Sequence, residues 1–164
     1  MKVKDVMIPL YDYLRPDDTI RDAVNIIRVA KRSEERVGVK GAPVLDEKGR
    51  LVGMVTIRDI LRAAYPPYFS LACMGQFTWE NMFTDMAKKI TNKLVKDIMS
   101  TDIATVREET TLMACLDLML KKGIRRLPVL DHEGKVLGMV YEREIFCAFV
   151  HAMLGDITCI DSSS

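Results

Sequence analysis

Two stretches of the chain place polar and charged side chains directly after an apolar strand. The first is Gly53-Met54-Val55-Thr56-Ile57-Arg58-Asp59, in which a hydroxyl, a cation and a carboxylate follow the strand as the pattern becomes helical. At such a strand-to-helix junction, the carboxyl end of the strand and the first amides of the helix point the same way. Phosphate and hydroxyl groups bind readily there. The second stretch, Gly138 to Glu144, repeats the plan with Tyr141 for Thr and Glu144 for Asp.

Other kinds of chemistry find no support in the sequence. No nucleophile has a base at motif spacing, and there is no glycine-rich phosphate loop. The four cysteines and two histidines do not have the spacing of a zinc site, and we expect the cysteines to be reduced and mostly in the core. We therefore predict no enzyme activity and no metal. These candidate ligands are Cys73, Cys115, Cys147, Cys159, His132 and His151.

The composition suits one soluble globular unit, or two small ones packed together. The chain has 164 residues, of which 49% are hydrophobic, and its formal charge is +1. This near-neutral balance argues against nucleic-acid binding, which would depend only on the cluster Lys88, Lys89, Lys93 and Lys96. Neither an apolar signal region nor a membrane-spanning stretch is evident, so we expect a cytoplasmic protein.

The sequence contains an internal duplication. Val3-Lys4-Asp5-Val6-Met7 returns as Val95-Lys96-Asp97-Ile98-Met99, an offset of 99 − 7 = 92. Pro43-Val44-Leu45-Asp46 returns as Pro128-Val129-Leu130-Asp131, an offset of 128 − 43 = 85. The first half therefore holds 92 − 85 = 7 extra residues, which we place between Lys31 and Gly38.

Each half predicts the element order β-α-β-β-α, an α/β (α+β) fold. The expected strands are 11–14, 42–45 and 51–56 in the first half and 103–106, 127–130 and 136–141 in the second, and the closing helices run from about 57 to 64 and from about 142 to 153. The first helix of each half follows its first strand. One has a start signal at residues 17–19 and an apolar face from Ile20 to Ile27, and the other has an apolar face from Leu112 to Met119 and ends at Gly123, a left-handed cap. We expect repeat 1 at residues 1–66, a connecting segment with a helix at 67–93, repeat 2 at 94–155 and a tail at 156–164. A unit of about 60 residues is marginal alone, so the halves should pack together as a pseudo-twofold pair.

The connecting segment carries an apolar stripe at helical spacing. Its members are Trp79, Met82, Phe83, Met86 and Ile90, and Thr78 is a plausible cap. This stripe predicts core packing or an interface between copies of the chain.

These motifs resemble the cystathionine-β-synthase (CBS) domain family, in the tandem arrangement called a Bateman module. The leading Asp-hydrophobic-Met and the middle Pro-Val-hydrophobic-Asp occur in both halves, whereas the closing Gly-hydrophobic-x-Thr/Ser-x-x-Asp is complete only at Gly53 to Asp59. The resemblance covers residues 1–65 and 94–154. It implies clefts between the paired sheets that hold adenosine-containing ligands, such as AMP, ADP, ATP or S-adenosylmethionine.

The resemblance also implies roles for single residues. Asp59 would take the ribose hydroxyls, Thr56 would help to hold phosphate, and Met54 is a reasonable packing contact for the base. The other implied contacts are Ile103 and Ala104, on the borrowed strand beside the base, and Lys40, Arg125, Arg126 and Arg143, which would reach the phosphates. A carboxylate for ribose and several cations for phosphate suit such a ligand chemically.

The second cleft departs from the family pattern. It offers Tyr141 and Glu144, and its borrowed strand supplies Tyr11 and Asp12. Glu would push a ribose outward, Tyr fills space, and an inward Asp12 would repel phosphate, so we expect this cleft to be empty or altered.

The sequence thus predicts a non-catalytic regulatory module that binds one adenosine-containing ligand per chain and forms a homodimer. It is either a stand-alone sensor that acts through an unidentified effector protein or a fragment of a larger protein. The alternative is a structural interaction protein that has lost its ligands and only dimerises. Each basic or acidic residue above also has a plain structural interpretation. Asp59 would be a helix-start carboxylate, and the arginine pair would be solvated strand-edge charges.

Overall fold

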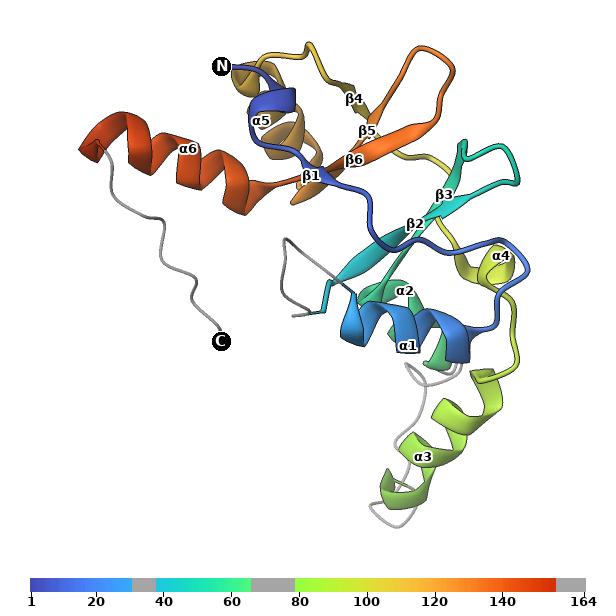
Figure 1. Cartoon of the computed structure of the whole chain (residues 1–164). Coiled ribbons are helices and arrows are strands. Elements are labelled where there is room, and N and C mark those ends of the chain that lie inside the picture. The colour runs from blue at the N-terminus through green and yellow to red at the C-terminus, as the bar shows by residue number, and fades with distance from the viewer. Residues whose placement is uncertain (31–37, 66–78, 156–164) are drawn as a thin grey trace.

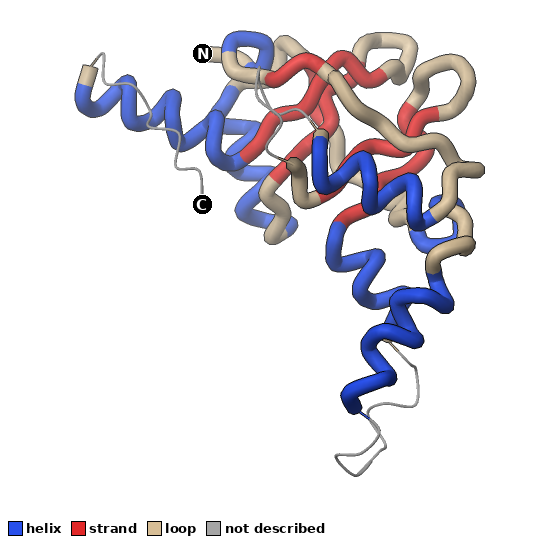
Figure 2. Tube along the Cα trace, turned by 60° about the horizontal axis from the view of Figure 1, so that its bottom comes forward, coloured by secondary structure: helices blue, strands red, loops and turns tan. Residues whose placement is uncertain are grey.

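A computed structural model describes residues 1–30, 38–65 and 79–155, apart from the side chains of residues 79 and 80. Strands occupy the centre and helices lie outside them (Figures 1 and 2). The elements are a short 3-10 helix (Val3–Asp5), β1 (Ile8–Pro9), α1 (Ile20–Val29), β2 (Gly41–Leu45), β3 (Leu51–Thr56), α2 (Ile57–Ala64), α3 (Trp79–Ile90), α4 (Val95–Ile98), β4 (Val106–Arg107), α5 (Leu112–Lys122), β5 (Arg126–Leu130), β6 (Val136–Tyr141) and α6 (Glu142–Leu154). The predicted mixed α+β fold is confirmed.

Two antiparallel hairpins, β2–β3 and β5–β6, form the centre of the molecule. At their open ends Gly41 pairs with Thr56 and Arg126 pairs with Tyr141, each residue of the second pair lying 85 positions after its counterpart. Both turns close through glycine with a positive φ, as the Asp-to-Gly turn signals predicted. β2–β3 stands alone as a two-stranded sheet, whereas β5–β6 belongs to a four-stranded sheet of order β1-β6-β5-β4.

The hairpins are related by a local twofold axis. Arg50 forms an antiparallel bridge with Lys135, and these are equivalent positions because 135 − 50 = 85. Only a twofold arrangement lets a position contact its own counterpart in this way. The two halves are therefore packed as the pseudo-twofold pair that the duplication predicted.

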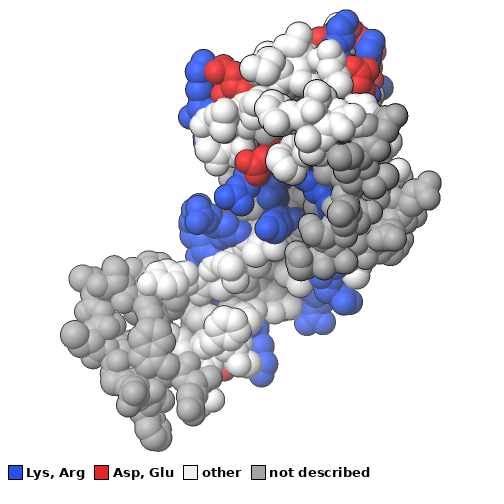
Figure 3. All heavy atoms as spheres, turned by 90° about the vertical axis from the view of Figure 1, so that its left-hand side faces the viewer, with Lys and Arg blue, Asp and Glu red and all other residues white. Residues whose placement is uncertain are grey.

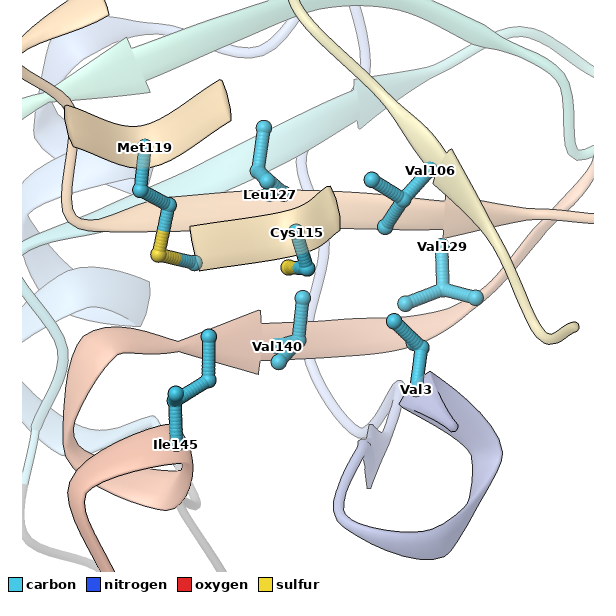
Figure 4. Close-up of a cluster of buried hydrophobic side chains, with 8 residues drawn as sticks. All are labelled: Val3, Val106, Cys115, Met119, Leu127, Val129, Val140 and Ile145. Atoms are coloured by element: carbon cyan, nitrogen blue, oxygen red, sulfur yellow. The ribbon is translucent and has the colours of Figure 1, made fainter. Parts of the chain in front are cut away.

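The leading segment of each repeat packs on the other half. β1 pairs with β6, and Val3 is fully buried in the core of the second half. Figure 4 shows Val3 pointing from the N-terminal segment toward Val129 and Val140. In exchange, Val95 is fully buried in the core of the first half. The proposed domain boundaries at 66 and 94 therefore follow the sequence repeats, while each core is completed by the other repeat.

The motif glycines make this exchange possible. A Cβ atom at Gly53 would lie 2.5 Å from the sulfur of Met99, which belongs to the exchanged segment. A Cβ atom at Gly138 would collide with the backbone oxygen of Ile8. Glycine at the start of each closing motif therefore lets the leading segment of the other repeat cross the strand closely.

Two strand predictions need correction. The expected strand at 11–14 is reduced to one bridge between Leu14 and Val44, and the first strand lies earlier, at Ile8–Pro9. In the second half β4 begins at Val106, the last residue of the expected strand at 103–106. The helix predictions agree more closely with the structure than the strand predictions do. Helix α2 has the predicted bounds, and Gly123 ends α5 in the left-handed conformation, with φ 63°.

The connecting helix α3 lies against the first half. Met82, Met86 and Ile90 line a largely apolar groove of about 600 Å³ between α1, α2 and α3. Phe83 also borders this groove but remains 78% exposed. Thr78, the side chain of Trp79, most of the expected insertion and the tail lie outside the described residues.

The prediction of reduced cysteines is wrong for Cys147, which is disulfide-bonded. Cys115 is a buried free thiol, and burial raises its pKa to about 11. Cys73 and Cys159 lie outside the described residues. No helix in the described part of the chain is long and apolar enough to cross a membrane, and within these ranges no group of three or more His, Cys, Asp or Glu residues is placed to hold a metal ion.

Candidate ligand site at the junction of the halves

Thr56 and Asp59 begin α2 as a reciprocal capping pair. The Thr56 hydroxyl accepts a hydrogen bond from the Asp59 amide at 3.2 Å, and it donates one to Asp59 Oδ2 at 2.8 Å. The Thr56 amide donates to the same carboxylate oxygen at 2.8 Å. This arrangement satisfies amide groups that the first turn of a helix leaves unpaired. Both residues therefore have a structural role, as the plain interpretation of Asp59 anticipated.

The same capping pair occurs at α1, so the Thr-x-x-Asp spacing alone does not mark a ligand site. There Thr19 Oγ1 donates to Asp22 Oδ2 at 2.7 Å, and the Asp22 amide donates to Thr19 Oγ1 at 3.2 Å. The difference lies in the surroundings. Asp22 is exposed on α1, whereas the Asp59 side chain is only 10% exposed. Its Oδ1 atom lies 3.9 Å from the Arg62 guanidinium, beyond hydrogen-bond distance.

Arg126 brings the second half to this helix start. The space that a Cβ atom of Gly41 would fill lies 2.6 Å from Arg126 Nη1 and 3.1 Å from Thr56 Cγ2. Gly41 and Arg126 are equivalent positions, since 126 − 41 = 85, so a glycine faces an arginine near the local twofold axis. One half therefore lacks a side chain where the guanidinium of the other half lies.

The guanidinium of Arg126 is poorly compensated. Its Nη1 atom is buried and has no hydrogen-bond partner among the described residues. Burial lowers the pKa of Arg126, and the neighbouring Arg125 lowers it further, while Tyr141 acts in the opposite direction. The junction thus holds a cation without a matching carboxylate in the described part of the chain.

The other predicted phosphate contacts surround the same ends of the hairpins. The Lys40 carbonyl accepts a hydrogen bond from the Ile57 amide at 3.0 Å, which fixes Lys40 beside the start of α2. Arg125 is 74% exposed and lies 3.7 Å from Glu142, and Arg143 is half-buried. Figure 3 shows Lys and Arg side chains gathered in the middle of one face of the molecule. Phosphate contact by each of these residues stays a prediction.

The predicted base contacts lie close to the crossing of the exchanged segment. Met54 is buried on β3 and pairs with Ser100 through hydrogen bonds of 2.9 Å in both directions. Ile103 and Ala104 follow shortly afterwards and are half-buried, and Ala104 packs against the core of the second half. Their contact with an adenine stays a prediction.

The second junction lacks the cap of the first. Tyr141 begins α6 without a side-chain hydrogen bond to the helix. Glu144 and Asp12 are half-buried, and Tyr11 is 47% exposed. The expectation that this cleft is empty or altered stays a prediction.

A comparison with protein families identifies the chain. The CBS domain family matches residues 3–65 and 95–151, which is most of the sequence. The chain belongs to the CBS domain family. Its two repeats form a CBS pair, and the crossing at Gly53 and Gly138 lies in the closing motif of each repeat.

Known relatives agree with this assignment. The solved structure of CBSX2 in complex with AMP, a protein of Arabidopsis thaliana, has a TM-score of 0.68 and 27% identity over 93% of this chain and 98% of that one. Inosine-5′-monophosphate dehydrogenase of Methanocaldococcus jannaschii is 28% identical over 88% of this chain. The matched region is only 23% of the length of the dehydrogenase. The uncharacterized protein MJ1426 of the same organism is 26% identical over 92% of both chains.

Sequence reasoning missed Gly41, the residue that gives Arg126 its place in the CBS pair. The repeat offset held the signal, because aligning the halves at 85 residues sets a glycine opposite an arginine just before the Pro-Val strands. A glycine within an otherwise buried strand indicates close approach by another group. The sequence does not distinguish Arg125 from Arg126, whereas in the structure Arg126 is directed into the junction and Arg125 lies near Glu142.

Proposed function

We propose that this CBS pair is a non-catalytic regulatory module that binds an adenosine-containing ligand between its repeats. One observation carries the proposal: the helix start at Thr56 and Asp59 in repeat 1 meets the Arg126 guanidinium of repeat 2 across Gly41. A ligand at this point contacts both repeats. The CBSX2 structure with AMP supports the ligand class, because it resembles this chain over nearly its full length.

Asp59 is the proposed ribose contact. Its Oδ2 atom is occupied by the capping pair, but Oδ1 lies beyond hydrogen-bond distance of Arg62, and a carboxylate oxygen accepts more than one hydrogen bond. Thr56 is less suited to hold phosphate directly, because its hydroxyl proton is donated to Asp59. We therefore assign Thr56 to the positioning of Asp59, and the cations to the phosphate end of the ligand.

Asp59→Ala tests the proposal, with Asp22→Ala as the matched control. Both substitutions remove the first-turn carboxylate of the same capping pair, so each should destabilise its helix by about 0.3–1 kcal/mol. Only Asp59→Ala should weaken adenosine and AMP, and by a similar factor, because both carry the ribose. Loss of a hydrogen bond to a charged group corresponds to roughly 10- to 150-fold in the dissociation constant.

Isothermal titration calorimetry provides the binding constants, and urea unfolding provides the stabilities. Equal weakening by both substitutions would mean that loss of the cap, and not of a ribose contact, disturbs the site. Normal binding by Asp59→Ala would remove Asp59 from the site. Failure of adenosine and its nucleotides to bind the unmodified protein would favour the alternative of a ligand-free interaction protein.

The proposed assembly is a homodimer that passes the ligand state to an effector protein. Helix α6 exposes Phe146, Phe149 and Met153 by 60–67%, at the i, i+3, i+7 spacing of one helix face. Such a contiguous apolar face is typical of an interface, and a twofold contact with a second copy is the commonest way to cover it. The cytoplasm, with its pool of adenine nucleotides, is the proposed compartment.

A further inference from the structure

The apolar groove between α1, α2 and α3 takes no part in the proposed ligand site. It has a volume of about 600 Å³, and its walls are largely apolar. Figures 1 and 2 show α3 extending away from the strands, with α2 beside it. Three large side chains that line the groove are more than half exposed: Leu61 (57%), Tyr65 (56%) and Phe83 (78%). A contiguous exposed apolar surface of this kind is typical of a docking site for another molecule.

The walls of the groove have the geometry that receives a further helix. A helix that enters such a groove places its own apolar residues at i, i+3, i+4 and i+7 against the walls. Flexible methionine side chains adapt their shape to the residues that they meet. Each wall helix presents apolar side chains three or four residues apart, namely Ile20 and Val24 on α1, Leu61 and Ala64 on α2, and Met82 and Met86 on α3.

The rim of the groove is basic on the α1 side. Arg21 lines the groove, and among the lining residues in the described part of the chain it is the one that carries a charge. Arg28 lies two turns further along the same face of α1, where its Nε atom donates to Asn25 Oδ1 at 3.3 Å. Asn25 also lines the groove, and both arginines are exposed. The α1 side therefore offers two accessible cations to an occupant.

The α3 side adds a third cation. Lys89 is exposed and follows Met86 by three residues, which places it on the same side of α3. Asp22 and Asp59 are held in their capping pairs and do not line the groove. Asp85 is the remaining carboxylate among the described side chains of the three helices, and it does not line the groove either. Carboxylates beside the apolar face of an incoming helix would therefore meet two arginines and a lysine.

We infer that this groove binds an amphipathic helix of a partner protein, with acidic residues flanking the apolar face of that helix. The apolar contact provides the affinity, and the charges on the rim select and orient the helix. Helix α6 of a second copy fits this description less well, because its carboxylates, Glu142 and Glu144, both lie in its first turn. The inference gives a chemical class to the effector of the proposed function, and it rests on that function for the existence of such a partner.

Three synthetic peptides of about 20 residues test the groove, a length at which an isolated helix can form. They share one leucine face at i, i+3, i+4 and i+7, and their flanking residues are glutamate, glutamine or lysine, which have similar helix propensities. Fluorescence anisotropy of the labelled peptides measures their dissociation constants. Three exposed ion pairs should make the glutamate peptide bind roughly 3- to 150-fold more tightly than the glutamine peptide. The lysine peptide should bind more weakly than both, and the differences should shrink at high salt.

Substitutions place the peptide on the groove. Leu61→Glu puts a carboxylate into the wall and should weaken the glutamate peptide by at least about tenfold. Leu120→Glu is the matched control, because Leu120 is 70% exposed on α5 and does not line the groove. Arg21→Gln should reduce the preference for the glutamate peptide over the glutamine peptide, whereas Arg107→Gln on β4 should leave this preference unchanged.

Equal binding of the three peptides would overturn the inference, because the groove would then be an unselective apolar surface. Failure of all three to bind would also overturn it and would favour a segment of the chain itself as the occupant. Equal weakening by Leu61→Glu and Leu120→Glu would place the peptide elsewhere, and dissociation of the dimer by Leu61→Glu in light scattering would assign the groove to a second copy. The peptide series on the unmodified protein does not depend on whether the variants fold. It contains no nucleotide, so its failure leaves the proposed ligand site untested and intact.

Discussion

Gly41→Ala tests directly whether the Arg126 guanidinium occupies the space beside Gly41. The new methyl group would lie 2.6 Å from Arg126 Nη1 and 2.9 Å from the Val55 carbonyl oxygen. Ordinary contact begins near 3.4 Å, so the guanidinium must move by about 3.4 − 2.6 = 0.8 Å and the strand by about 3.4 − 2.9 = 0.5 Å.

Overpacking of this kind typically costs about 1–3 kcal/mol, while replacing glycine by alanine restricts the unfolded chain and returns about 0.4–1 kcal/mol. We therefore expect a net loss of about 1.3 kcal/mol in the free energy of unfolding, within a range of roughly 0–2.6 kcal/mol. Urea unfolding measures this loss as a lower midpoint with an unchanged m-value.

A double-mutant cycle isolates the contact with the guanidinium. Arg126→Ala removes the closer of the two clashes and leaves the one with Val55. Gly41→Ala should therefore cost less in the Arg126→Ala background, with a coupling energy above about 0.5 kcal/mol. Equal cost in both backgrounds would refute a tight contact between Arg126 and Gly41, because it would show that the guanidinium moves aside freely and that Val55 alone opposes the methyl group.

Two further predictions concern the assembly and the N-terminal segment. Light scattering should report a dimer at tens of micromolar. Phe149→Asp should weaken this dimer, because the Phe149 side chain is 60% exposed on α6. A monomeric unmodified protein would contradict the homodimer. Ion pairs with Lys2 and Lys4 lower the pKa of Glu109 to about 2. Because this pKa is below its unfolded value of about 4.3, Glu109 stabilises the fold above pH 4.3, and the contribution is lost as the pH falls toward 2. Unfolding midpoints of Glu109→Gln and the unmodified protein should therefore converge in acid and at high salt, whereas a constant difference would exclude ionisation as the cause.

Local sequence signals predicted turns and helix ends well where a residue type strongly favours one backbone conformation. Asp and Gly placed the two hairpin turns, and Gly123 placed the end of α5. Hydrophobic pattern could not show which half a segment packs on. Val3 and Val95 precede equivalent apolar runs, and each satisfies the pattern equally well in its own repeat or in the other. The exchange of leading segments is visible only in three dimensions.

Prediction of the site was limited in a similar way. The Thr56 and Asp59 motif was found, but its spacing is also that of an ordinary helix cap, which α1 possesses as well. The disulfide of Cys147 depends on approach in space and leaves no trace in the spacing of the cysteines. The importance of Gly41 comes from the side chain that it lacks, and only the position of Arg126 reveals it.

The exchange of leading segments has a consequence for the ancestry of the protein. A chain with one repeat would carry its leading valine on a segment that reaches over a neighbouring unit, and its own core would lack that residue. Such a chain could complete its core only by taking the segment from a second molecule, as domain-swapped dimers do. Gene duplication would then have joined two interlocked molecules into one chain, with residues 67–93 as the added connection and Arg126 facing Gly41 as a later divergence from symmetry.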